Sequence, residues 1–290
     1  MNLKKTVILL CMFVAASVTP ALAQIDWNNQ SPAGIGDDIW CVTYAGGTFA
    51  ATTSQGRVLT SSDGLTWSSQ TIAAGTWLVS IAYGNGTWVA VGAGGTILVS
   101  TNLTTWVSAK AVTANKLNGV LYANGIFVAV GDSATIVTSP DGLNWTTQPV
   151  PSSFGVTGFL HGITWFPASS QFFISGAVAG NGTGSIDTGA VLAMSGTPSA
   201  GTQNYSLFPR GTGSSLASSS SATVGNLESI LFQPSVGMVS VGWLGTVLES
   251  GGIISSYNSR LTPSVIPNVV YRGLTYGNGY WVAAGEQAQS

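Results

Sequence analysis

The single histidine, His161, is the side chain of this sequence best suited to acid–base chemistry near neutral pH. One histidine alone is more often a packed or solvated residue than a catalytic base, so its neighbours decide its role. Glu228 and Arg272 occupy positions in the sequence that are related to His161 by a repeat described below. If these three side chains meet, they form a polar pocket that could hold a ligand. Whether they meet depends on the elements that carry them.

Asp63 and Asp141 lie in two similar segments and could act as paired catalytic carboxylates or as calcium ligands. A hard cation needs several converging oxygen ligands, whereas each segment offers one carboxylate, so we expect no metal site. An Asp that precedes a Gly in a tight turn accepts backbone N–H groups, and an Asn can do the same. We therefore predict a structural role for eight turn residues: Asp63, Gly64, Trp67, Asn102, Trp106, Asp141, Gly142 and Trp145.

A 39-residue repeat must position all of these side chains. Two sets of anchors recur at that spacing, namely Tyr44, Tyr83 and Tyr122, and Trp67, Trp106 and Trp145. Within one period, four runs rich in β-branched and aromatic residues are separated by Gly, Asn and Asp; the runs are 80–83, 87–91, 96–100 and 105–108. Four short antiparallel strands in each of several repeats predict an all-β protein, a β-propeller built of four-stranded blades.

Less regular copies carry the pattern through the rest of the sequence. The predicted blades lie near 40–77, 78–116, 117–155, 159–222, 225–268 and 270–290, with long Gly/Ser-rich loops over 177–223 and one strand, Ala190–Met194, within them. Trp27 precedes Tyr44 by nearly the distance that separates Trp67 from Tyr83, so Ile25–Asn29 is predicted to be a fourth strand that completes the last blade. One strand of that blade is still missing. We expect six blades, or seven if the sequence is truncated after Ser290.

The segments Ser61–Trp67 and Ser139–Trp145 resemble the Asp-box, the S-x-D-x-G-x-T-W hairpin between the third and fourth strands of sialidase-type propellers. Both lack one residue between Asp and Gly, and Ser100–Trp106 has neither the Asp nor the Gly. The resemblance implies a BNR/Asp-box-like propeller, a group that includes sialidases, photosystem II assembly-factor propellers, sortilin-type receptors and exported bacterial repeat proteins. It also implies that this turn lies on the face opposite the active site. It is specific for fold rather than function.

Propeller ligands bind where the loops that enter the first strands meet the loops that join the second strands to the third. The repeat places Trp40, Val79, Asn118, His161, Glu228 and Arg272 in the first set, and Ser54, Ala93, Asp132, Ala177, Trp243 and Glu286 in the second. These positions differ between repeats, as they would in a binding surface and equally in unconstrained loops. The predicted binding residues are Trp40, Asn118, Asp132, His161, Glu228, Trp243, Arg272 and Glu286.

Two functions are compatible with this arrangement. The leading hypothesis is a non-catalytic binding or scaffold module that engages a protein or a surface glycan at the channel mouth, without a cofactor or a metal. Trp40, Trp77 and Trp243 could stack on sugar rings, although tryptophans in a propeller more often fill the space between blades. The alternative is a glycan-acting hydrolase of sialidase-like architecture. Resemblance to sialidases implies three convergent arginines. Outside the signal the arginines are Arg57, Arg210, Arg260 and Arg272, and the repeat does not bring three of them together.

The first 23 residues are predicted to be a signal peptide. Lys4 and Lys5 precede an apolar run from Val7 to Val18, and Ala21-Leu22-Ala23 forms an A-x-A cleavage pattern. The run is too short to span a bilayer, so we expect a secreted or periplasmic protein in which residues 24–290 form one domain. Only 8 basic and 10 acidic residues occur in the sequence, which argues against nucleic acid as the partner. We expect a monomer. Removal of the signal leaves Cys41 as the single thiol, so we expect no internal disulfide.

Overall fold

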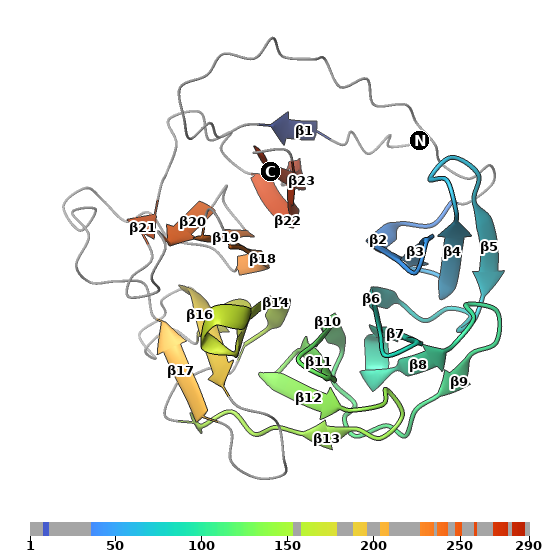
Figure 1. Cartoon of the computed structure of the whole chain (residues 1–290), viewed down its shortest axis with the longest axis horizontal. Helices are drawn as coiled ribbons and strands as arrows, with labels where there is room; N and C mark the ends of the chain where they lie inside the picture. Colours follow the sequence, from blue (N-terminus) through green and yellow to red (C-terminus); the bar gives the residue numbers. More distant parts are fainter. Residues whose placement is uncertain are drawn as a thin grey trace.

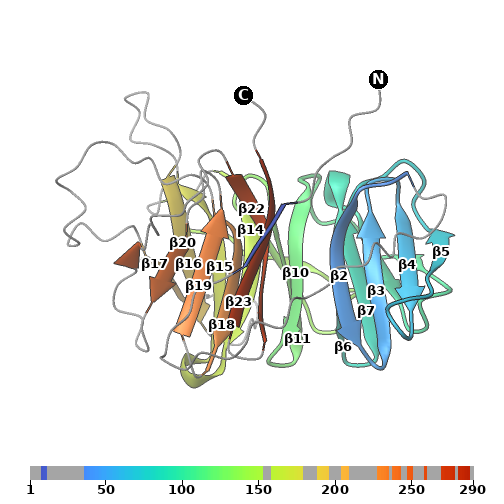
Figure 2. The ribbon, with the colours of Figure 1, turned by 90° about the horizontal axis from the view of Figure 1, so that it is seen from above.

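The computed structural model describes residues 8–11, 36–152, 158–178, 188–195, 204–208, 227–234, 237–242, 247–250, 258–259, 269–277 and 280–287. These residues form five four-stranded antiparallel sheets and one three-stranded antiparallel sheet. The sheets stand around a central axis with their first strands innermost (Figure 1), and in the perpendicular view they lie side by side as the blades of a disc (Figure 2). The predicted all-β propeller of four-stranded blades is therefore confirmed.

The first three blades follow the 39-residue repeat closely. Blade 1 contains β2 (Ile39–Ala45), β3 (Thr48–Thr53), β4 (Arg57–Ser61) and β5 (Ser68–Thr71). Blade 2 contains β6 (Leu78–Gly84), β7 (Thr87–Gly92), β8 (Ile97–Ser100) and β9 (Val107–Ser108), with a 3₁₀ turn η1 (Ala93–Gly95) between β7 and β8. Blade 3 contains β10 (Leu117–Ala123), β11 (Ile126–Gly131), β12 (Thr135–Ser139) and β13 (Thr146–Thr147).

The remaining sheets carry the longer connections. Blade 4 contains β14 (Leu160–Phe166), a 3₁₀ turn η3 (Pro167–Ser169), β15 (Gln171–Val178), β16 (Thr188–Ser195) and β17 (Asn204–Phe208). Blade 5 contains β18 (Leu227–Gln233), β19 (Gly237–Gly242), β20 (Val247–Ser250) and β21 (Asn258–Ser259). Blade 6 contains β22 (Val269–Gly277), β23 (Tyr280–Gln287) and β1 (Ile8–Cys11). The predicted strand Ala190–Met194 lies within β16, whereas β17 was not predicted and occupies part of the stretch that was expected to form loops.

Blade 6 is completed in a way that the sequence did not indicate. Strand β1 pairs antiparallel with β23, with Ile8 opposite Gly285 and Cys11 opposite Val282, so it takes the third-strand position. The predicted closing strand Ile25–Asn29 lies outside the described residues. We expected residues 1–23 to lie outside the fold, yet the structure pairs four of them, because a run of Ile and Leu suits a strand edge as well as a signal. Cleavage of the signal stays a prediction.

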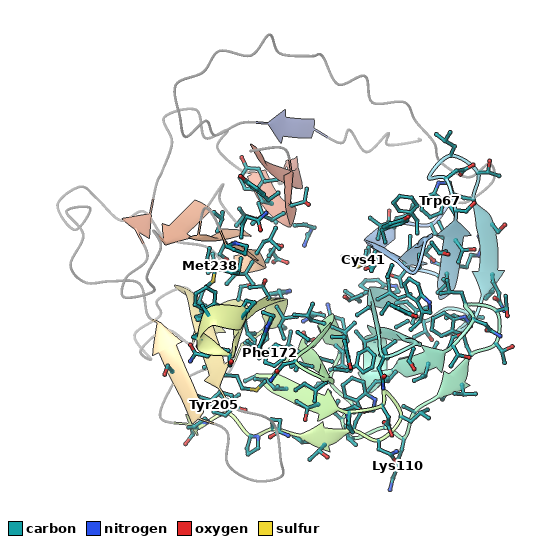
Figure 3. The ribbon with its side chains drawn as sticks, viewed as in Figure 1. Cys41, Trp67, Lys110, Phe172, Tyr205 and Met238 are labelled. Atoms are coloured by element: carbon teal, nitrogen blue, oxygen red, sulfur yellow. The ribbon has the colours of Figure 1, made fainter. Side chains whose placement is uncertain are left out.

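The core lies between neighbouring blades rather than at the axis. The fully buried Phe172 belongs to a cluster that joins β11 and β12 to blade 4, and the buried Met238 belongs to a cluster that joins blade 4 to blade 5. Figure 3 shows these two residues among the side chains packed between sheets, with Trp67 and Lys110 near the outer edge of the ring. This packing holds the first strands in place around the channel.

Candidate functional site

Every first strand has one irregularity at the same place. In β10, Leu117 pairs with Gly131 and Gly119 pairs with Val130, so Asn118 has no partner in the ladder. Such β-bulges redirect a side chain and are common next to functional sites. The residues skipped in this way are Trp40, Val79, Asn118, His161 with Gly162, Glu228 and Arg272. The six positions that the repeat singled out are thus bulge positions of the innermost strands.

The loops on either side of these strands meet at one end of the ring. In blades 1 to 4, the backbone N–H of the residue near the end of the second strand donates to the carbonyl of the residue that enters the first strand. These bonds are Ser54 to Asp38, Ala93 to Trp77 and Asp132 to Lys116 at 2.9 Å each, and Ala177 to Phe159 at 3.2 Å. We call this end of the ring the channel mouth. The turns between third and fourth strands lie at the opposite end.

His161, Glu228 and Arg272 meet at the channel mouth. The His161 Nδ1 atom lies 3.4 Å from Glu228 Oε2, and Arg272 Nη1 lies 3.6 Å from the same oxygen. The three residues come from the first strands of blades 4, 5 and 6, and we call them the mouth cluster. The Glu228 side chain is 9% exposed, while that of Arg272 is 41% exposed. The carboxylate therefore holds two residues in place, and the guanidinium retains surface that faces solvent.

Burial makes the imidazole of His161 predominantly neutral at pH 7. Desolvation lowers the pKa of His161 below its ordinary value of 6.5; the negative charge of Glu228 opposes this shift, and the positive charge of Lys116 adds to it. A neutral imidazole donates from one nitrogen and accepts at the other. With Nδ1 directed at Glu228, the Nε2 atom can accept a hydrogen bond from a ligand.

Asn118 and Asp132 extend the polar side of the mouth into blade 3. The Asn118 Nδ2 group donates to Asp132 Oδ1 at 2.8 Å and to the carbonyl of Leu160 at 2.9 Å. The second bond reaches the first residue of β14, so Asn118 ties blade 3 to the strand that carries His161. The negative charge of Asp132 partly opposes the lowering of the His161 pKa that burial causes. The polar side of the mouth thus runs from blade 3 to blade 6.

The opposite side of the mouth is aromatic. Trp40 and Trp77 stack with ring centroids 5.8 Å apart and an interplanar angle of 27°. They are 38% and 47% exposed, so the pair presents ring surface to solvent. Of the other predicted mouth residues, Trp243 lies outside the described residues. Glu286 lies in β23 opposite Val270, and only its backbone is described. The repeat did not identify Lys116 and Phe159 as residues of the channel mouth, because they lie in loops that no repeat motif marks.

The predicted turn residues form the same hydrogen bonds in three blades. Asp63 Oδ1 accepts the N–H groups of Leu65 and Thr66 at 2.8 Å each, and Asn102 and Asp141 accept equivalent groups. The indole Nε1 of each Trp donates to a turn carbonyl: Trp67 to Gly64, Trp106 to Leu103 and Trp145 to Gly142. These side chains are occupied within their own turns, far from the channel mouth.

The same bonds stabilise the charged form of the two turn aspartates. Hydrogen bonds from Thr66, Leu65 and Ser61 lower the pKa of Asp63 to about 2. Burial alone would raise the pKa of Asp141, but hydrogen bonds from Asn144, Leu143 and Ser139 lower it to about 2. Within the described ranges, no group of three His, Cys, Asp or Glu side chains is placed to hold a metal ion. No helix among those residues has the length and apolar character to cross a membrane.

Comparison with known protein families and with curated protein sequences finds no match. Solved structures do match. YCF48 bound to D1 peptide has a TM-score of 0.60 and 14% identity over 87% of this chain and 78% of that one. An ancestral GH74 enzyme has a TM-score of 0.57 and 15% identity, over 86% of this chain and 38% of that one. The Neurospora crassa Pan2 WD40 domain has a TM-score of 0.54 and 11% identity, over 87% and 76%. At these identities the likeness shows the propeller fold alone.

Proposed function

We propose that the protein is a non-catalytic binding module that engages a segment of a partner protein at the channel mouth. The observation that carries this proposal is the meeting of His161, Glu228 and Arg272, from three separate blades, across the mouth from the stacked Trp40 and Trp77. The partly exposed guanidinium of Arg272 suits a carboxylate or a backbone carbonyl, and exposed indole rings suit apolar side chains. One similar propeller was solved with a bound peptide.

A surface glycan is the second candidate, and the stacked tryptophans favour it. The exposed ring surfaces of Trp40 and Trp77, whose centroids lie 5.8 Å apart, can pack on pyranose rings while the polar side of the mouth binds hydroxyl groups. Hydrolysis of a glycan is less well supported, because glycosidases place two carboxyl groups on either side of one bond. Here Glu228 is held by His161 and Arg272, and Asp132 accepts from Asn118. The likeness to a GH74 enzyme keeps this alternative worth testing.

We also infer that the chain is an Asp-box-like propeller that is exported. The repeated Ser-Asp-Trp turns and their shared hydrogen bonds support the first inference. The apolar run with its A-x-A pattern supports the second. Amino-terminal sequencing of the protein from a fractionated host tests export: a chain beginning at Gln24 outside the cytoplasm agrees with it, and an intact Met1 in the cytoplasm contradicts it.

Binding is tested on peptide and glycan arrays with the folded protein and three variants. Arg272→Gln and Trp40→Ala alter the two sides of the mouth, and Lys110→Gln is the matched control, because Lys110 lies at the outer edge of the ring (Figure 3). We expect Arg272→Gln to weaken binding of the best peptide about tenfold, as expected for a loss of about 1.4 kcal/mol. The Lys110→Gln variant should bind like the unaltered protein. Turnover of any glycan would contradict a non-catalytic role.

A further inference from the structure

The described blade junctions share one construction. Alternate residues of the second and third strands of one blade cover the first strand of the next blade. Between blades 2 and 3, Val91 of β7 and Ile97 of β8 pack in one cluster with Leu117 of β10. Corresponding clusters join blades 1 and 2, 3 and 4, 4 and 5, and 5 and 6. The first-strand residues covered in this way are at most 7% exposed: Leu78, Leu117, Leu160, Leu227 and Tyr271.

Strand β2 departs from this pattern, although its sequence follows the repeat. Ile39, at the position of Leu78 and Leu117, is 52% exposed. Val42 is 58% exposed, whereas its equivalents Ile81, Val120 and Ile230 are buried. Tyr44 is 60% exposed, whereas Tyr83 and Tyr122 are half-buried. We call Ile39, Val42 and Tyr44 the β2 face. Three large side chains whose described equivalents are buried or half-buried at the other junctions are here exposed to solvent.

Within the part of the chain that the structure describes, no blade packs against the β2 face. Each described first strand from β2 to β22 packs against the next one, but no comparable packing joins β22 back to β2. Figure 1 shows β2 on one side and β22 with β23 on the other side of this interval in the ring. The other side of β2 already contacts blade 2, since Thr43 Oγ1 donates to the carbonyl of Ile81 at 2.7 Å. The exposed side is therefore the one that a preceding blade would cover.

We propose that the β2 face is the docking surface for one further four-stranded blade, supplied by polypeptide outside residues 1–290. The five existing junctions define its chemistry: it presents alternating apolar residues such as Val, Ile, Ala or Phe to β2. A contiguous exposed apolar patch marks a protein contact rather than a solvated surface. The docked blade lies between Arg272 and Trp40 in the ring, so its own bulge residue completes the channel mouth.

The proposal is tested by extending the full chain. A Gly/Ser linker and a second copy of residues 78–116 are appended after Ser290, which supplies a blade of the required pattern. We expect the melting temperature to rise by several degrees, and oxidation of Tyr44 by hydroxyl radicals to fall to the level of Tyr83. The matched control carries Val91→Asp and Ile97→Asp in the appended copy only, and it should show neither change. Ile39→Asp should cancel the gain in the extended chain and change the original chain little.

Three results would overturn the proposal. The first is an extended chain that folds without protecting Tyr44. The second is slow oxidation of Tyr44 in the original chain, equal to that of Tyr83, which would mean that residues 12–35 or blade 6 cover the face in solution. The third is a dimer that Ile39→Asp dissociates, which would make a second copy the occupant. The second and third measurements use the original chain, so they decide the matter even if the extended chain fails to fold.

Discussion

The two ends of the ring use the same repeat in opposite ways. At the turn end, blades 1 to 3 repeat one arrangement, in which a Ser, an Asp or Asn and a Trp form hydrogen bonds within seven residues of chain. At the channel mouth, equivalent positions hold different residues, and their bonds join one blade to another, as Asn118 joins Leu160 and Glu228 joins His161 and Arg272. Uniform local bonding serves stability, whereas varied contacts between blades suit recognition. We therefore expect substitutions at the turn end to reduce stability, and substitutions at the channel mouth to affect ligand binding more than stability.

The largest effect should come from a tryptophan of the turn end. Trp145 is 7% exposed and packs 6.4 Å from the Phe127 ring. We expect Trp145→Ala to lower the free energy of unfolding by about 3–5 kcal/mol, because it removes a large buried ring and leaves a cavity. Trp40→Ala, at the exposed mouth, should cost about 1 kcal/mol or less. Urea unfolding followed by circular dichroism measures both, and equal losses would contradict the division between the two ends.

A smaller effect should follow from removing a turn carboxylate. Asp141→Ala leaves the N–H groups of Leu143 and Asn144 without their acceptor, which should cost about 1 kcal/mol. Asp141→Asn should cost less, since Asn102 fills the same role in blade 2. If the alanine and asparagine variants are equally stable, the hydrogen bonds contribute nothing measurable.

The stabilisation that the Asp141 carboxylate provides should depend on pH, because the pKa of Asp141 is lowered in the folded protein. Because the folded-state pKa lies near 2 and the ordinary value is 3.8, the carboxylate stabilises the fold above about pH 4. That stabilisation is lost as the pH falls from about 4 towards about 2. The free energies of unfolding of the unaltered protein and of Asp141→Asn should therefore converge as the pH is lowered. A difference between them that does not change with pH would contradict this assignment.

The mouth should respond at a higher pH, with the smallest effect on stability. Burial lowers the pKa of His161 in the folded protein, so below 6.5 the unfolded chain binds the proton more readily. Stability should therefore decrease as the pH falls through 6.5, and His161→Gln should remove this part of the pH dependence. Melting temperatures between pH 5 and 8 test the prediction. An unchanged slope in the variant would show that His161 does not titrate differently on folding.

The sequence predicted the periodic features well and the non-periodic ones poorly. Counting back four residues from the anchor aromatic of each repeat identified the bulge positions from Trp40 to Arg272 without any knowledge of bulges, because every repeat places its first strand in the same register. The sequence could not identify β17, because the surrounding sequence is rich in Gly and Ser and the strand is stabilised by its pairing with β16. It also could not reveal that Ile39 is exposed while Leu78 is buried, because burial depends on whether a neighbouring blade is present. The apolar segment Ile8–Cys11 is compatible both with a signal peptide and with an edge strand, so its pattern alone did not reveal that it pairs with β23.

We expect ligands to bind at the channel mouth and not at the turn end. Hydroxyl-radical footprinting with and without the best peptide from the arrays tests it most directly, because tryptophans with solvent-accessible surface mark both ends. We predict that the bound peptide protects Trp40 and Trp77 from oxidation and leaves Trp67 and Trp106 unchanged. Protection of Trp67 and Trp106, with Trp40 and Trp77 unaffected, would contradict the account.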